Sequence, residues 1–313
     1  MEHTNPRAAY GETLVALGRD NESIVVLDAD LGGSTMGKLF ELEYPDRHFE
    51  VGIAEANMTS IAAGLAAVGK IPFINSFAVF ASGRAFDQIR QTICIGELNV
   101  KIAGSSAGLS DFGDGATHQS VEDIAIMRAI PNLTVISPSD ANEAAAATKA
   151  IAAYDGPVYL RLNRHDSVKV TEADAPFIIG EPTIKRAGDD IAVFATGITV
   201  AMALEAAKIL EGEVSVRVIN VSTIKPLCPD KISKLASGCK GIVTAEEHSV
   251  IGGLGSAVCE ALRLEPKPVE FVGIQDIYGV SAHNYEELLS HYGITTQAIT
   301  DAIRRAKHHS AKP

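Results

Sequence analysis

The sequence predicts an α/β protein of two domains, each a mostly parallel sheet covered by helices. Three observations support this prediction. Short runs rich in Val and Ile alternate with longer amphipathic patterns, which is typical of βαβ units. The alternation weakens between residues 163 and 188 and then restarts. The chain has 313 residues, 46% of them hydrophobic and 21% charged, which suffices for two cores of ordinary size.

The first domain is expected over residues 1–165, followed by an irregular linker over 166–188 and a second domain over 189–313. Apolar runs bounded by Gly, Pro or polar residues predict strands at 23–30, 47–52, 71–77, 99–104, 132–138, 156–162, 190–197, 214–221, 240–247 and 267–273. Apolar residues at spacings of three and four predict helices at 6–18, 57–69, 83–95, 121–130, 140–153, 199–210, 229–236, 253–264, 284–291 and from about 296.

Charge and composition exclude several classes of protein. The net charge of -12 argues against a nucleic-acid or anionic-membrane surface, because such surfaces are recognised by Lys and Arg. No apolar run approaches the roughly 18 residues of a membrane span, and no leader opens the sequence. The four cysteines form no C-x-x-C motif and are interpreted as reduced core thiols. We therefore expect a cytoplasmic protein.

One carboxylate, Glu55, lies between a predicted strand and an apolar helix in HFEVGIAEANMTSIAAGLAAVG, residues 48–69. It falls in the first turn of that helix or just before it. There it can be an ordinary N-terminal charge, stabilised by roughly 0.3–1 kcal/mol through the helix dipole. If it is buried among its apolar neighbours, however, it costs several kcal/mol unless a partner is present. A functional role therefore requires a partner for Glu55.

Polar and aromatic side chains follow the carboxyl ends of several predicted strands, where ligands bind in open α/β sheets. They are Asp28, Asp30 and Ser34 after the first strand, Glu55 after the second, Phe77 and Phe80 after the third, Asp114 and His118 in the glycine-rich loop 104–119 after the fourth, and Arg161 and Arg164 after the sixth. Such a set predicts a pocket for a polar, partly aromatic ligand.

Five segments carry a resemblance to a known family. They are GIAEANM, INSFAVFASGRAFDQIR, DGATHQSVEDIAIMRAIPNLTVISPSDANE, VSTIKPL and TAEEHSVIGGLGSAV, in this order over nearly the whole chain. With them the sequence resembles the C-terminal half of the thiamine-diphosphate-dependent transketolases. The resemblance implies a pyrimidine-binding domain followed by a transketolase C-terminal domain. It also implies transfer of a two-carbon ketol unit from a ketose phosphate to an aldose phosphate, in pentose phosphate metabolism or in a route for an uncommon carbohydrate.

The resemblance assigns four residues to the cofactor, thiamine diphosphate. Glu55 matches the glutamate that hydrogen-bonds the aminopyrimidine ring and promotes the imino tautomer, whose exocyclic nitrogen deprotonates the thiazolium carbon. It is therefore the expected catalytic residue, and the cofactor is its expected partner. Phe80 matches the aromatic residue that stacks on the aminopyrimidine, with Phe77 beside it. Asp30 matches an acidic residue near cofactor and substrate.

Four more residues are assigned to the substrate by the same resemblance. Asp114 and His118 match groups that hydrogen-bond the hydroxyls of the sugar donor. Ser34 and Arg164 match contacts to the terminal phosphate, for which the planar guanidinium of Arg is suited. Ser106 stands where many transketolases have a histidine, which puts part of the usual sugar or phosphate contact in doubt.

Each assignment has a structural alternative. Phe77 and Phe80 can be core aromatics, and Asp114 beside Gly can be a turn residue. His118 can be a structural or surface histidine, and Arg164 can pair with an acid in the linker.

Other motifs are set aside. The segment GDG (113–115) with Asn142 loosely mimics a magnesium signature, but it lies in the sugar-contacting segment, so no metal ligand is expected in this chain. GGLGSA (252–257) lacks the third glycine of a dinucleotide fingerprint and is expected to allow close helix packing or subunit contact. EEH (246–248) and HH (308–309) are interpreted as surface residues.

A full transketolase also has an N-terminal domain that grips diphosphate and Mg²⁺. We therefore expect this chain to be the second subunit of a split transketolase. A separate subunit would bind Mg²⁺, the site would be shared, and the complex would be a two-plus-two heterotetramer. Alone, the chain is expected to be an inactive dimer. Alternatives are a subunit of a deoxyxylulose-phosphate synthase or of a 2-oxoacid dehydrogenase, or a non-catalytic scaffold subunit.

Overall fold

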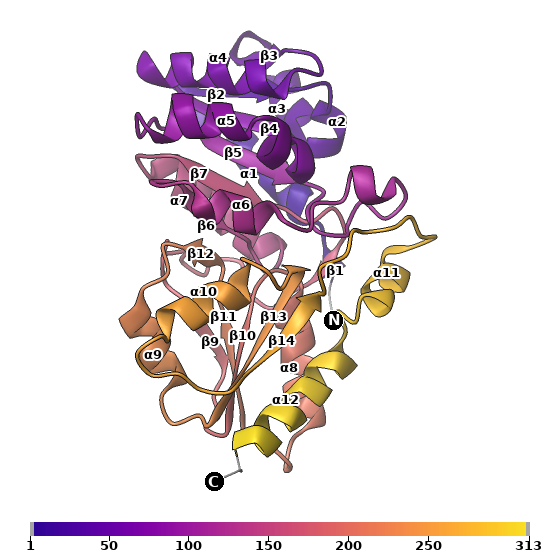
Figure 1. Cartoon of the computed structure of the whole chain (residues 1–313). Coiled ribbons are helices and arrows are strands. Elements are labelled where there is room, and N and C mark those ends of the chain that lie inside the picture. Colours follow the sequence, from indigo (N-terminus) through magenta and orange to yellow (C-terminus); the bar gives the residue numbers. More distant parts are fainter. Residues whose placement is uncertain (1–2, 311–313) are drawn as a thin grey trace.

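The structure is a computed structural model that describes residues 3–310. Seven strands form the sheet of the first domain, in the order β12-β6-β7-β5-β4-β2-β3 (Figure 1). Their bounds are β2 Ile24–Asp28, β3 His48–Glu50, β4 Ile71–Phe77, β5 Lys101–Ser105, β6 Thr134–Ile136, β7 Val158–Arg161 and β12 Thr223–Lys225. All neighbours are parallel except β12, which is antiparallel to β6. The predicted fold class is confirmed.

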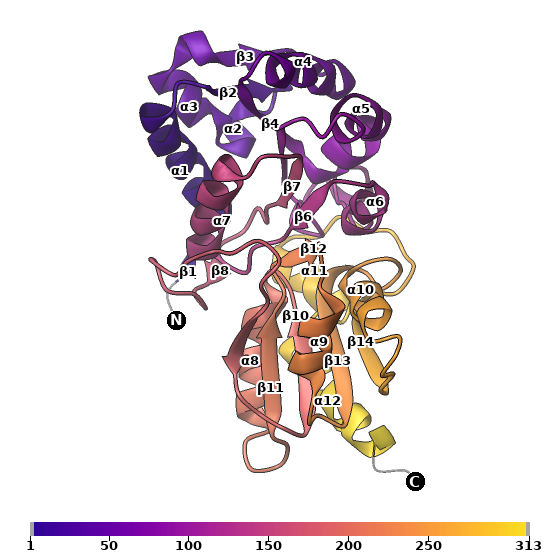
Figure 2. The ribbon, with the colours of Figure 1, turned by 90° about the vertical axis from the view of Figure 1, so that its left-hand side faces the viewer.

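Helices cover both faces of this sheet, as Figure 2 shows from the side. One face carries α1 (Pro6–Asp20), α3 (Gly37–Glu43) and α7 (Ala141–Ala153), and the other carries α4 (Glu55–Ala67), α5 (Phe86–Gln88) and α6 (Asp123–Ala129). The short helix α2 (Gly32–Thr35) follows β2. Local signals explain the helix starts: Asn5 caps α1 with Pro6 at its first position, and Asp140 caps α7 by accepting from the Glu143 N–H.

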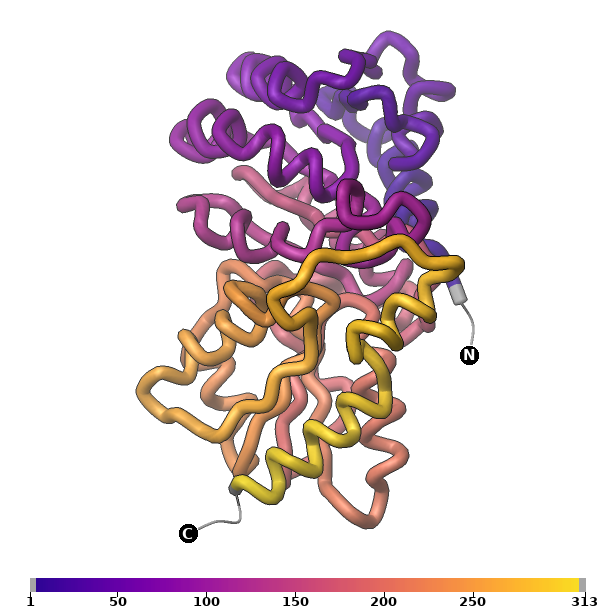
Figure 3. The backbone as a smooth tube through the Cα atoms, turned by 45° about the vertical axis from the view of Figure 1, so that its right-hand side comes forward, coloured from indigo at the N-terminus to yellow at the C-terminus, as the bar shows by residue number. Residues whose placement is uncertain are grey.

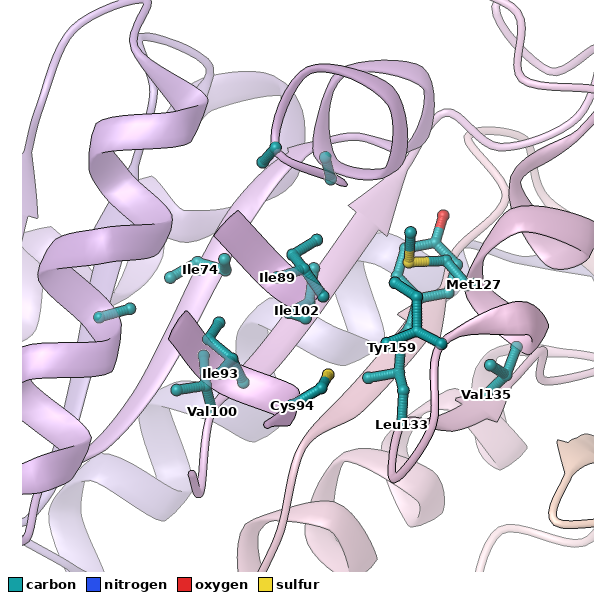
Figure 4. Packing of buried hydrophobic residues seen from close by; sticks show 14 of the residues in the cluster. Ile74, Ile89, Ile93, Cys94, Val100, Ile102, Met127, Leu133, Val135 and Tyr159 are labelled. Carbon is teal, nitrogen blue, oxygen red and sulfur yellow. The ribbon is translucent and has the colours of Figure 1, made fainter. Parts of the chain in front are cut away.

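The apolar core beneath α4 to α6 contains many Ile and Val side chains, together with Ala, Leu, Met, Cys and Tyr, packed on the sheet. Figure 4 shows Ile74 and Ile102 from neighbouring strands facing Ile89 and Ile93, with Cys94 at the edge of the group. Because close-packed interiors leave little freedom, this core fixes where the strand ends emerge.

The second domain has a five-stranded sheet in the order β14-β13-β10-β11-β9. Its strands are β9 Thr183–Arg186, β10 Ile191–Ala195, β11 Val216–Asn220, β13 Gly241–Ser249 and β14 Val269–Ile274, all parallel except β9. The helices α8 (Thr199–Ile209) and α12 (Thr296–Ser310) cover one face, and α9 (Pro229–Ala236) and α10 (Leu254–Ala261) cover the other (Figure 1). The helix α11 (Tyr285–His291) lies near the junction of the domains.

Two stretches differ from the prediction. The segment 166–188 is not wholly irregular, since β8 (Ser167–Val168) pairs with β1 (His3–Thr4) and β9 joins the second sheet. The predicted helix 83–95 is α5 between two π-helical segments, Phe80–Arg84 and Ile89–Cys94. The Ser82 hydroxyl donates to the Ala78 carbonyl, and such back-bonding competes with the regular helical ladder.

The interpretation of residues 246–248 as surface is wrong. The side chains of Glu246, Glu247 and His248 are buried, because β13 runs through the middle of the second domain and ends against the first. The Nδ1–H of His248 donates to the Ser249 carbonyl, and its Nε2 accepts from the Ala125 N–H. Burial lowers the pKa of His248 to about 4, which fits this neutral, fully bonded ring.

The buried His248 should make stability depend on pH. Its pKa in the folded protein lies below the ordinary histidine value of 6.5. Its contribution to stability is therefore present above pH 6.5 and is lost as the pH falls toward 4, up to about 3 kcal/mol. Urea unfolding of His248→Gln between pH 4 and 7 should therefore show less loss on acidification than the parent. His291→Gln, which changes an exposed histidine, is the control and should keep the parent's pH profile.

Candidate active site

Glu55 is the first residue of α4, and its carboxylate is buried, with only 4% of the side chain exposed. The Nη1 of Arg84 lies 3.1 Å from its Oε1. A partner for the buried carboxylate is therefore present within the chain, and it is an arginine; pairing of Glu55 with the cofactor stays a prediction. Arg84 was missed by the sequence analysis although it lies in the segment INSFAVFASGRAFDQIR, because its role depends on a partner 29 positions away.

Three aromatic side chains lie beside this ion pair. The rings of Phe77 and Phe80 stack with centroids 5.9 Å apart, and the ring of His118 meets Phe80 edge-on at 5.3 Å. The guanidinium of Arg84 lies 4.1 Å from the centroid of the Phe80 ring. The structure thus brings together four predicted site residues and Arg84. Phe77 is almost fully buried, whereas Phe80 and His118 are only partly covered.

The other predicted acids are placed at the same edge of the sheet but point into solvent. Asp30 is exposed, and its own backbone N–H donates to Glu50. Asp114 is exposed at the start of a short turn in the loop after β5, as its alternative reading as a turn residue also predicts. Within residues 3–310, no hydrogen bond or ion pair joins either carboxylate to another predicted site residue.

A second polar group surrounds Arg164. Its Nη1 lies 2.8 Å from the Asp111 carboxylate, and its carbonyl accepts from the Asn5 side chain. Arg7 donates to the Ser34 carbonyl. Burial and the nearby Arg164 lower the pKa of Arg7, so the two guanidiniums lie within electrostatic reach of each other. Arg7 therefore contacts the Ser34 backbone and lines the same cavity as Arg164. The sequence analysis missed it because it lies inside the helix predicted over 6–18.

A cavity of about 400 Å³ opens onto this group and is lined by Asn5, Arg7, Arg164 and His165, among others. The buried Nε of Arg7 and Nε2 of His165 lack hydrogen-bond partners in the structure. Burial lowers the pKa of His165, which stacks on Tyr285 with ring centroids 4.6 Å apart. The two arginines and an unpartnered donor suit an anion such as phosphate, although the carboxylates of Asp166 and Glu286 also line the cavity.

Asp28 holds the loop that carries Ser34. It is fully buried, and its carboxylate accepts from Thr35 at 2.8 Å and lies 3.0 Å from His48 Nε2. A Cβ on Gly37 would come within 2.0 Å of this carboxylate, so only glycine fits there. Asp28 therefore positions α2 rather than facing a ligand.

The remaining motifs are structural. A Cβ on Gly255 would lie 2.4 Å from the Phe271 ring, so the segment 252–257 allows close packing as predicted. Ser106 is fully buried with φ +53 and does not face the open site. Within residues 3–310, no group of three His, Cys, Asp or Glu side chains is placed to hold a metal ion, and no helix is long and apolar enough to cross a membrane.

Comparisons with known proteins identify the class. Residues 3–168 match the transketolase pyrimidine binding domain, and residues 180–299 match the transketolase C-terminal domain. A chain provisionally named transketolase C-terminal section in Methanocaldococcus jannaschii is 45% identical, over 95% of this chain and 94% of its own length. The 6-deoxy-6-sulfo-D-fructose transketolase subunit SqwH of a Clostridium species is 42% identical, over 95% and 92%.

A solved structure also supports the similarity to transketolases. A split gene transketolase, described as an inactive beta4 tetramer, has a TM-score of 0.89 and 45% sequence identity, and the match covers 98% of this chain and 99% of that chain. The chain belongs to the transketolase family, and the resemblance found in the sequence is confirmed.

Breaking the pair between Arg84 and Glu55 should destabilise the chain. Arg84→Met keeps the apolar stem but leaves the Glu55 carboxylate buried without its partner. Because the Arg84 side chain is 53% exposed, water screens the pair, and we expect a loss of about 1–2 kcal/mol in the free energy of unfolding. Arg90→Met, at an exposed arginine in the following π-helical segment, is the control for urea unfolding. Equal stability of the two variants would show that the pair contributes nothing.

Proposed function

We propose that this chain is the second subunit of a split transketolase. In this role it supplies the aminopyrimidine half of a shared active site for transfer of a two-carbon ketol unit between sugar phosphates. The observation that carries the proposal is the buried carboxylate of Glu55 at the head of α4, beside the stacked Phe77 and Phe80. A buried carboxylate needs a partner; here that partner is the half-exposed Arg84, which a ligand can displace.

The residues present fit the pyrimidine end of thiamine diphosphate. Glu55 offers a carboxylate that can exchange a proton along one hydrogen bond with a ring nitrogen. Phe80 offers a ring for stacking, provided that the half-exposed Arg84 moves from its position near that ring. Bound there, the cofactor supplies the electron sink for the two-carbon unit. Phe77 excludes water behind Phe80, and Asp30 is proposed to lie near cofactor and substrate.

The substrate is proposed to lie between the two polar groups of the site. Asp114 and His118 would bind sugar hydroxyls at one end, and both side chains reach solvent. Arg164, with Arg7 and the backbone held at Ser34, would bind the terminal phosphate at the other end. The two arginines of this cavity support a phosphorylated substrate.

The partner is proposed to be a separate N-terminal subunit that binds Mg²⁺ and the diphosphate. Relatives of matching length that are named as a section or a subunit, and the solved split gene transketolase, support this division. Self-association into a two-plus-two heterotetramer is supported by exposed apolar side chains next to α4, such as Ile53 and Phe49. The free thiols of all four cysteines support a cytoplasmic location.

Activity should require both subunits. Ketol transfer from xylulose 5-phosphate to ribose 5-phosphate is measured with this chain alone and after mixing with a candidate N-terminal subunit, thiamine diphosphate and Mg²⁺. We expect activity only in the mixture. Turnover by the chain alone would contradict the assignment as a split enzyme. A mixture that binds the cofactor but does not turn over these sugar phosphates would direct the search to pyruvate and other donors.

In the active mixture, Glu55→Gln should lower kcat by about 100-fold or more, because proton exchange with the ring nitrogen is lost. Glu12→Gln, at an exposed carboxylate on α1, is the matched control. Full activity of Glu55→Gln would favour the scaffold alternative.

Arg164→Ala should weaken binding of phosphorylated acceptors. Loss of a charge-assisted hydrogen bond is worth about 1.5–3 kcal/mol, so the KM for ribose 5-phosphate should rise about 10- to 100-fold. The KM for glycolaldehyde, which has no phosphate, should stay near that of the parent. Arg7→Ala should behave in the same way, whereas Arg263→Ala on the second domain should change neither value. An unchanged KM for ribose 5-phosphate in Arg164→Ala would show that this arginine does not bind phosphate.

A further inference from the structure

We infer that Glu247, in the second domain, is a positioning residue that holds together the two ends of the substrate site in the first domain. This inference rests on the proposed function, because those ends are the proposed sugar and phosphate contacts. Glu247 touches neither contact directly. It acts on the loop that carries Asp114 and His118 and on the segment that carries Arg164.

The carboxylate of Glu247 bonds to both parts. Its Oε1 accepts from the backbone N–H of Leu109 at 2.7 Å, and its Oε2 accepts from Asn163 Nδ2 at 2.9 Å. Leu109 begins the loop that leads to Asp114, and Asn163 directly precedes Arg164. One side chain therefore bridges two segments that are 54 positions apart in sequence, counting from Leu109 to Asn163.

The approach of this carboxylate to the loop is unusually close. A Cβ on Gly108 would lie 2.5 Å from the Glu247 carboxyl carbon, and Gly108 has φ +64, which favours glycine. The carbonyl of Glu247 accepts from Arg161 Nη2 at 2.9 Å, so its backbone is fixed as well. The side chain is buried, and Asn163 also donates to the Tyr285 hydroxyl, which encloses the group. These contacts leave the bridge little freedom to shift.

The loop has further contacts. Within the first domain, the Ala107 N–H donates to the Leu162 carbonyl, and Gly108 and Ser120 exchange two backbone hydrogen bonds. Asp111 pairs with Arg164, whose side chain is 36% exposed. Farther along, Phe112 accepts from the Ala282 N–H, and Gln119 donates to the Val280 carbonyl. Figure 3 shows this segment between β14 and α11, in orange, reaching across to the first domain. Among the described contacts of the loop with the second domain, the one made by Glu247 is buried and lies nearest to the start of the loop.

The preceding residue provides a matched comparison. Glu246 is on the same strand and equally buried, but side chains alternate along a strand, so it faces the opposite side. Its carboxylate accepts from the N–H groups of Leu254 and Gly255 at the start of α10. Removal of Glu246 is therefore expected to disturb the start of α10, whereas removal of Glu247 is expected to disturb the loop.

The first test is hydrogen exchange on the isolated chain, which requires no activity. In Glu247→Ala, the backbone amides of residues 109–112 should exchange at least about tenfold faster than in the parent, as expected when a bond worth about 1.4 kcal/mol is lost. Glu246→Ala should leave this segment unchanged and accelerate exchange at the start of α10. Equal exchange of residues 109–112 in both variants would overturn the inference.

The second test is kinetic and uses Glu247→Gln, which keeps an oxygen for the Leu109 N–H but presents an unsuitable NH₂ group to Asn163. In the active mixture, its KM for ribose 5-phosphate should rise about tenfold while kcat changes by less than about threefold. A matching loss of kcat with unchanged KM would overturn the positioning role. If no mixture turns over sugar phosphates, the proposed function fails, and the exchange experiment still decides whether Glu247 holds the loop.

Discussion

The buried charge of Arg161 at the end of β7 is the constraint on which the site depends. Its Nε lies 2.8 Å from the Asp123 carboxylate on α6. Burial opposes this charge, but Asp123 and Glu247 more than offset the cost, and the pKa of Arg161 lies above its ordinary value. Because a guanidinium cannot lose its proton to escape burial, strand β7, helix α6 and strand β13 must stay in register. The loops after β5 and β7 are built on that junction.

The fold was predictable because its dominant signals are local. The Val- and Ile-rich runs that became β2, β4 and β10 are buried on both faces, and no competing pattern disturbs them. The prediction from sequence failed where tertiary contacts determine the secondary structure. Strand β12 has three residues and forms only by pairing with β6 of the other domain, and β9 lies in a stretch with no apolar pattern. Glu246 to His248 look polar in sequence and are buried only because partners from two domains meet there.

The residues of the candidate site likewise fall into those that local sequence signals predict and those that depend on tertiary contacts. Residues that follow strand ends, such as Phe77, Phe80 and His118, were predictable from topology and motif, and the structure brings them together. Arg84 and Arg7 were not, because each lies within a segment read as a helix, and its role depends on a partner 29 or 27 positions away. Long-range pairing of charges leaves no periodic trace in a single sequence. It is visible only when the fold has brought the partners together.

Strand β12 follows β11 of the second domain in the chain but pairs at the edge of the first sheet, which limits how the two domains can be recombined. A chimera joined in the segment between the sheets would take β12 from its donor, and with it the edge of the recipient's sheet. A first half made alone would expose the backbone groups of β6, and open strand edges favour aggregation. The two halves are therefore separable by family description but not as independent building blocks, and shuffling would succeed best with cuts that keep both sides of this strand pair together.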